Sequence, residues 1–172
     1  MSEAEPLEVK NLDRYGSAAL EWSRARGALE RAVGPDVTWF LGTCRDGVPH
    51  AAGVGALWYE GDLYFTSGPG TRKSRNLSVN PACTISVRLP GIDLVLEGTA
   101  ARTVEPALLE ALAARYRAGG RPAQVQGDAL VAPFSAPAAG PPPWHLYRFR
   151  FHTVFGTAGA EPLGATRWRF TA

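Results

Sequence analysis

The stretch from Thr66 to Arg75 concentrates the side chains best able to bind a ligand. It contains four hydroxyl residues, two glycines and three basic residues, and a helix is predicted to begin inside it. Backbone N–H groups at a helix start bind anions, and arginine can add two parallel hydrogen bonds to phosphate oxygens. The spacing matches neither a P-loop nor a dinucleotide fingerprint. The stretch is therefore either a phosphate site or a solvent-exposed basic turn. The hydroxyl residues are Thr66, Ser67, Thr71 and Ser74, the glycines are Gly68 and Gly70, and the basic residues are Arg72, Lys73 and Arg75.

The preceding strand, residues 51–56, has almost no side-chain bulk. Gly53 and Gly55 stand two residues apart and so share one face of the strand. Glycine weakens a strand, and its presence there often indicates that something approaches the backbone closely. The sequence leaves two explanations open: a flat ring system lies across the strand, or the strand packs tightly against a helix or a neighbouring subunit.

No other motif supplies chemistry. His50, His145 and His152 are not spaced with cysteines or carboxylates as metal ligands would be, so we expect no metal site. There is no nucleophile elbow and no pair of carboxylates placed as acid and base, so the catalytic residues are unknown. A phosphate loop beside a bare strand, without catalytic side chains, indicates that a bound cofactor carries the chemistry.

The pattern of apolar residues and turns predicts a mainly β protein with flanking helices. A loose arm is expected over residues 1–16 and a long Pro-, Ala- and Gly-rich loop over residues 121–143, within a single domain spanning 1–172. Short antiparallel strands with few helices favour a small barrel, and Gly98 is a candidate β-bulge. Strands are predicted at 38–44, 49–58, 62–66, 82–88, 93–104, 144–155 and, short, 165–170, and helices at 17–33 (ended by Gly34 and Pro35), about 71–80 and 106–117.

Composition excludes several classes. The 172 residues carry 18 basic and 16 acidic side chains, a balance that argues against a nucleic-acid protein. The apolar runs are too short for a membrane helix, and the polar segment Met1 to Lys10 does not resemble a secretory signal. Cys44 and Cys83 are expected to be buried free thiols. We therefore expect a cytoplasmic protein without nucleic-acid or membrane partners.

Residues 38–104 resemble the FMN-binding split-barrel family that includes pyridoxamine 5′-phosphate oxidase and the flavin/deazaflavin oxidoreductases. The resemblance rests on several short motifs taken together. They are Asp46-Gly-Val-Pro-His50, Gly61-Asp-Leu-Tyr-Phe-Thr66, Thr71-Arg-Lys-Ser-Arg-Asn-Leu77 with Asn80-Pro81, and Leu96-Glu-Gly-Thr-Ala100.

The resemblance implies a six-stranded antiparallel split barrel, a homodimer, and FMN in a groove between the subunits, with the deazaflavin F420 as the alternative cofactor. It implies that Val54, Gly55 and Ala56 line the ring and that Phe65, Thr66 and Ser67 give backbone contacts. Thr71, Arg72, Lys73, Arg75 and Asn76 match the segment that holds the phosphate, with Arg72 and Lys73 at the clamp itself.

The function implied is that of a flavin-type oxidoreductase. It would transfer hydride to or from a small organic substrate, and the protein would supply the groove, the phosphate clamp and the orientation. The alternative is a non-catalytic flavin- or anion-binding protein, since the sequence offers no acid or base that excludes it.

Overall fold

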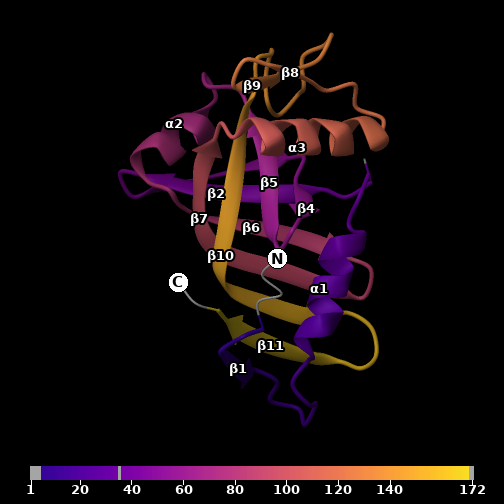
Figure 1. Cartoon of the computed structure of the whole chain (residues 1–172). Helices are drawn as coiled ribbons and strands as arrows, with labels where there is room; N and C mark the ends of the chain where they lie inside the picture. Colours follow the sequence, from indigo (N-terminus) through magenta and orange to yellow (C-terminus); the bar gives the residue numbers. More distant parts are fainter. Residues whose placement is uncertain (1–4, 35, 171–172) are drawn as a thin grey trace.

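A nine-stranded antiparallel sheet forms the body of the protein in the computed structural model, which describes residues 5–34 and 36–170 (Figure 1). The predicted mainly β class is confirmed, and the architecture is that of a split barrel. The main path of the sheet runs β1-β11-β10-β7-β6-β2-β3, and β5 pairs with β10 and β4. The strands of this sheet are β1 (Glu8–Asn11), β2 (Trp39–Arg45), β3 (Val48–Val54), β4 (Leu57–Tyr59), β5 (Asp62–Ser67), β6 (Ala82–Leu89), β7 (Ile92–Thr103), β10 (His145–Ala158) and β11 (Gly164–Arg169).

The long strand β10 joins the two parts of the barrel. Its first residues pair with β5, its last residues pair with β11, and β7 accompanies it along both parts. The β10–β7 register shifts between Phe151 and Thr153, which pair with the consecutive residues Gly98 and Glu97. The β-bulge predicted at Gly98 therefore lies opposite it, on β10. A Cβ on Gly98 would stand 2.1 Å from the Arg150 carbonyl oxygen. Glycine is therefore required there by the close approach of two backbones.

Three helices flank the sheet: α1 (Trp22–Arg31), α2 (Arg72–Val79) and α3 (Pro106–Ala118). The helix predicted over residues 17–33 is shorter, because the chain before Trp22 instead bonds to the sheet, where the Leu20 N–H donates to Thr166 Oγ1 at 2.8 Å. Pro35, half of the predicted stop signal, lies outside the described residues. The strand predicted over residues 49–58 divides into β3 and β4 at Gly55 and Ala56.

Two apolar clusters stabilise the fold. The larger one fills the barrel and includes Trp39 and Trp168, which are fully buried. The smaller one lies under α3, where Leu109 and Leu112 pack with Tyr64 of β5. Helix α3 is thereby fixed against the end of the barrel at which β5 finishes (Figure 1).

Two segments predicted to be irregular contain strands. Part of the N-terminal arm forms β1, which pairs with β11 and places Glu8 opposite Arg169. Residues 1–4 of that arm lie outside the described residues. The loop over residues 121–143 contains a hairpin of β8 (Gln124–Gln126) and β9 (Ala129–Val131), and Leu130 also bridges to Trp144. Three- and four-residue strands are too short to show a periodic pattern, and β1 also depends on a partner distant in the sequence. Within the described residues, no helix is long and apolar enough to cross a membrane.

Candidate functional site

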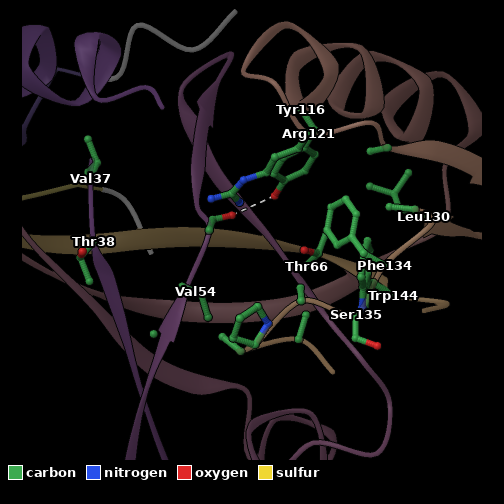
Figure 2. A pocket seen from close by; sticks show the side chains of 18 residues that line it. Val37, Thr38, Val54, Thr66, Tyr116, Arg121, Leu130, Phe134, Ser135 and Trp144 are labelled. Atoms are coloured by element: carbon green, nitrogen blue, oxygen red, sulfur yellow. Dashed lines mark hydrogen bonds between the residues drawn. The ribbon is translucent and has the colours of Figure 1, made fainter. Parts of the chain in front are cut away.

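A cavity of about 420 Å³ opens beside the end of β3 (Figure 2). Its walls include β3, β5, the C-terminal end of α3 and the segment from Ala132 to Ala139, with Val37, Thr38, Leu130 and Trp144 completing the lining. Most of the lining is apolar, and Arg121 is the charged residue among the lining side chains. Such a cavity has the size and character of a small-molecule or cofactor site. The side chains that line it most prominently are Val54, Thr66, Tyr116, Arg121, Leu130, Phe134 and Trp144.

The hydroxyl of Tyr116 fixes one wall of the cavity. It donates to the Gly55 carbonyl oxygen at 2.9 Å, as the dashed line in Figure 2 shows. Burial raises the pKa of Tyr116 to about 12, against smaller opposing effects of a Thr66 hydrogen bond and the Arg121 charge. Tyr116 therefore remains a neutral donor at ordinary pH and ties α3 to the break between β3 and β4.

The two glycines of the bare strand have different surroundings. A Cβ on Gly53 would meet nothing within 4 Å, whereas one on Gly55 would stand 2.3 Å from Arg121 Nη1. Thus Gly55 accommodates the guanidinium of this chain's own Arg121, and Gly53 leaves open space at the cavity. Tight packing therefore accounts for Gly55, where the neighbour is the Arg121 side chain, and the ring explanation stays a prediction for Gly53.

The start of α2 is closed by its own hydroxyl groups. Thr71 is the N-cap residue, and its hydroxyl accepts the Ser74 N–H at 3.3 Å. The Ser67 hydroxyl lies 2.8 Å from both the Thr71 and the Ser74 hydroxyls. These three side chains therefore shape the loop. The N–H groups of Arg72 and Lys73 in the first turn have no acceptor within the helix, and the helix dipole favours an anion beside them.

Arg72 and Lys73 differ in their surroundings although they are neighbours. Arg72 is exposed, whereas Lys73 is 3% exposed and its ammonium donates to the Ala138 carbonyl oxygen. Both charges reach His50 on β3: burial lowers the pKa of His50 most, followed by the charges of Arg72 and Lys73. Burial also lowers the pKa of Lys73.

Residues 132–140, called the strap below, contact both the cavity and the segment that begins α2. Ala132 and residues 134–139 line the cavity, and the Gly68 N–H donates to the Ala139 carbonyl oxygen at 2.9 Å. The strap folds back on itself through hydrogen bonds between Ala136 and Gly140. The long loop that the sequence left without a motif therefore forms a wall of the cavity.

Several candidate residues face elsewhere. Phe65 is fully buried and stacks on Tyr147, with ring centroids 5.2 Å apart. Asn76 is buried and donates to Thr43 Oγ1 at 3.0 Å, which fastens α2 to β2. The Arg75 guanidinium donates to the Gly70 carbonyl oxygen, and Arg75 lines a separate hollow beside His145. Ala56 is buried in the barrel core. The structure thus brings Val54, Gly55 and Thr66 to the cavity and places these other side chains in structural roles.

The lining also contains residues that the sequence did not indicate. From the sequence, Tyr116 is one position near the end of the helix predicted over 106–117, and Trp144 is the first residue of the strand predicted over 144–155. A partial signal existed for Arg121, which follows two glycines at the end of α3 and precedes a proline. That pattern predicts a turn but cannot show that the turn returns to β3, since the return depends on packing between distant segments.

Metal ligands and a disulfide are both missing from the described part of the chain. No group of three or more His, Cys, Asp or Glu residues is placed to hold a metal ion there. Cys44 and Cys83 are free, and burial raises the pKa of the Cys83 thiol to about 12.

The fold and the site together define an antiparallel split barrel with a ring-sized cavity next to a basic helix start. A family model described as pyridoxamine 5′-phosphate oxidase matches residues 27–157, which is well over half of the chain. The chain therefore belongs to the pyridoxamine 5′-phosphate oxidase family. A comparison with curated proteins finds no match.

Solved structures share the fold at low sequence identity. A NimC/NimA family protein from Clostridium acetobutylicum is 18% identical with a TM-score of 0.55, covering 84% of this chain and 91% of that one. An FAD-binding protein from Mesorhizobium loti is 13% identical with a TM-score of 0.54, covering 93% and 96%. PhzG from Burkholderia lata 383, solved with tetrahydrophenazine-1-carboxylic acid, is 16% identical with a TM-score of 0.56, covering 88% and 83%.

Proposed function

We propose that the protein is a flavin-type oxidoreductase that binds FMN at the cavity and transfers hydride to or from a small organic substrate. The observation that carries this proposal is a bare strand with open space at Gly53, close to a basic helix start whose Arg72 charge acts on His50 of the same strand. A family relationship and an FAD-binding relative of the same fold support a flavin. The flavin, when bound, would supply the hydride chemistry.

The residues of the chain would bind and orient the cofactor. Val54 and Gly55 would lie beside the ring, and the backbone around Thr66 would contact its edge. Arg72 and the free N–H groups of the first turn of α2 would hold the phosphate. Tyr116 would keep the Gly55 backbone in place and Arg121 would add a positive charge at the cavity wall, while the apolar strap would exclude water.

A second copy of the chain would complete the groove. The residues Gly53, Phe40, Ser86 and Val95 form an uncharged row across β3, β2, β6 and β7, as the register shows. Phe40 and Val95 are 50% and 41% exposed. Because Gly53 belongs both to this row and to the cavity lining, a partner on this face would border the cofactor. We propose a C2 homodimer with an interface of about 2,000 Å².

The experiment is a spectroscopic titration of the purified protein with FMN and, separately, with F420. The proposal expects a perturbed ring absorption band and saturable binding by FMN. Preferential binding of F420 would retain the site and the hydride chemistry but change the cofactor. Binding of neither would overturn the proposal.

Catalysis needs a separate measurement, because the second candidate is a non-catalytic flavin- or anion-binding protein. The lack of any carboxylate or histidine among the cavity-lining residues favours that alternative. The bound cofactor is reduced, and a panel of organic acceptors is then added without oxygen. Reoxidation by an acceptor, faster than that of free reduced cofactor, supports the enzyme. No reoxidation by any acceptor of a broad panel supports the non-catalytic binding protein.

We also propose that the protein is cytoplasmic, because its two cysteines are free thiols, which are typical of the reducing cytoplasm.

A further inference from the structure

Lys73 stands in the expected phosphate clamp, but its ammonium is directed at the strap. The side chain is 3% exposed, and the Ala138 carbonyl oxygen accepts a hydrogen bond from it. A buried ammonium is costly unless it is hydrogen-bonded, so this contact is a strong constraint on the strap. Arg72, the preceding residue, is exposed and makes no comparable contact with the strap within residues 5–34 and 36–170.

A second contact from the same loop reaches the strap at the neighbouring residue. The Gly68 N–H donates to the Ala139 carbonyl oxygen at 2.9 Å, and a Cβ on Gly68 would stand 2.4 Å from that oxygen. Two consecutive strap carbonyls are therefore held from the segment that begins α2. At the next residue of the strap, Trp144 Nε1 donates to the Gly140 carbonyl oxygen at 2.9 Å.

Two further contacts order the strap: the hydrogen bonds between Ala136 and Gly140, and the Phe134 ring, whose centroid lies 6.2 Å from that of Trp144. Its residues are mostly alanine and proline with a single glycine, which offer few side-chain contacts, and Phe134 is 46% exposed. Ala136, Ala138 and Ala139 nevertheless line the cavity. The position of that wall depends on hydrogen bonds made to its backbone.

We infer that Lys73 is a positioning residue that fixes the strap and thereby sets the width of the ring cavity, with Gly68 as its structural partner. An ammonium has three donors, so Lys73 can hold the Ala138 carbonyl whether or not an anion lies at the helix start. The role assigned to Lys73 differs from that of Arg72: Lys73 shapes the cavity for any ring, and Arg72 selects a phosphate.

The first test needs no ligand. In Lys73→Met, which keeps the length but removes the donors, limited chymotrypsin cleavage after Phe134 should accelerate by about 10-fold or more, as loss of a charged hydrogen bond implies. Gly68→Ala should reproduce the effect, since its methyl group would displace the Ala139 carbonyl. Arg75→Met, a charge removal on the same helix away from the strap, is the control and should cleave like the wild type.

Urea unfolding of each variant distinguishes local opening of the strap from a loss of global stability. If cleavage in Lys73→Met and Gly68→Ala rises no more than their loss of global stability accounts for, the inference is overturned. The same holds if cleavage does not change in either variant.

The second test rests on the proposed function and uses riboflavin, which lacks the phosphate. Lys73→Met should weaken riboflavin and FMN binding by similar factors. If FMN binding weakened while riboflavin binding did not change, Lys73 would be a phosphate ligand, and the inference would be overturned. If the wild type bound neither ligand, the proposed function would fail, and the cleavage result would still decide the role of Lys73.

Discussion

Removal of the Arg72 guanidinium should separate phosphate recognition from ring recognition. Arg72 is the first residue of α2 and is exposed, so a ligand phosphate can reach it without displacing a protein group. A hydrogen bond to a charged group contributes roughly 1.5–3 kcal/mol. At about 1.4 kcal/mol per decade, Arg72→Ala should raise the Kd for FMN about 10- to 100-fold. Arg72→Lys should lose less, because lysine keeps the charge but not the paired donors.

The assay is a fluorescence or absorbance titration with FMN and riboflavin in parallel. Riboflavin affinity should not change in Arg72→Ala, because that ligand has no phosphate. Arg75→Ala is a matched control: it removes the same charge one turn away, where the guanidinium donates to the Gly70 carbonyl oxygen and lines another hollow. Equal losses of FMN and riboflavin affinity in Arg72→Ala would show general damage to the groove and refute the clamp.

Four further predictions follow from particular contacts. Phe40→Glu should yield a monomer in light scattering and weaken FMN binding, because it places a charge in the proposed dimer face; an unaltered dimer would contradict that face. Gly53→Val should leave the apo melting temperature nearly unchanged, since a Cβ there meets nothing within 4 Å, yet weaken FMN binding at least about 10-fold if the ring lies against that strand. Tyr116→Phe should cost about 1 kcal/mol near pH 8. Folding raises the pKa of Tyr116 from 10.0 to about 12, so the neutral side chain stabilises the folded state fully below pH 10, and this stabilisation declines as the pH rises toward 12. The free energy of unfolding in urea should therefore fall less between pH 8 and pH 11 in Tyr116→Phe than in the wild type. Cys44 should react with a thiol reagent at pH 8 in the native protein while Cys83, whose pKa is about 12, reacts only after unfolding; fast reaction of Cys83 would contradict its burial.

Local signals in the sequence predicted most of the barrel. Alternating apolar residues and turn pairs such as Asp46-Gly47 placed the strands of the first meander to within a few residues, and Pro106 marked the start of α3. The division of the second long strand at Gly55 was not predicted. At this break the Gly55 carbonyl oxygen accepts the Tyr116 hydroxyl of α3, a tertiary contact that local sequence patterns do not indicate.

The candidate site was only partly predictable for the same reason. The sequence pointed to the bare strand and to the basic loop, and the structure places Gly53 and Thr66 at one cavity. The basic loop looked uniform, yet its side chains divide between an exposed Arg72, a buried Lys73 and an Arg75 that faces another hollow. Burial by the strap makes this distinction, and the strap is 65 residues from Lys73 in the chain.

In the proposed complex, FMN lies with its ring at strand β3 and its phosphate at the start of α2. Amide hydrogen exchange of the wild-type protein, with and without FMN, tests this directly. FMN bound in this way should add protection in two separate stretches, residues 53–55 and residues 70–74. A second hollow on the sheet is lined by residues that include His50 and Cys83. FMN binding with protection confined to that hollow, or with no protection in either predicted stretch, would contradict this placement of the cofactor.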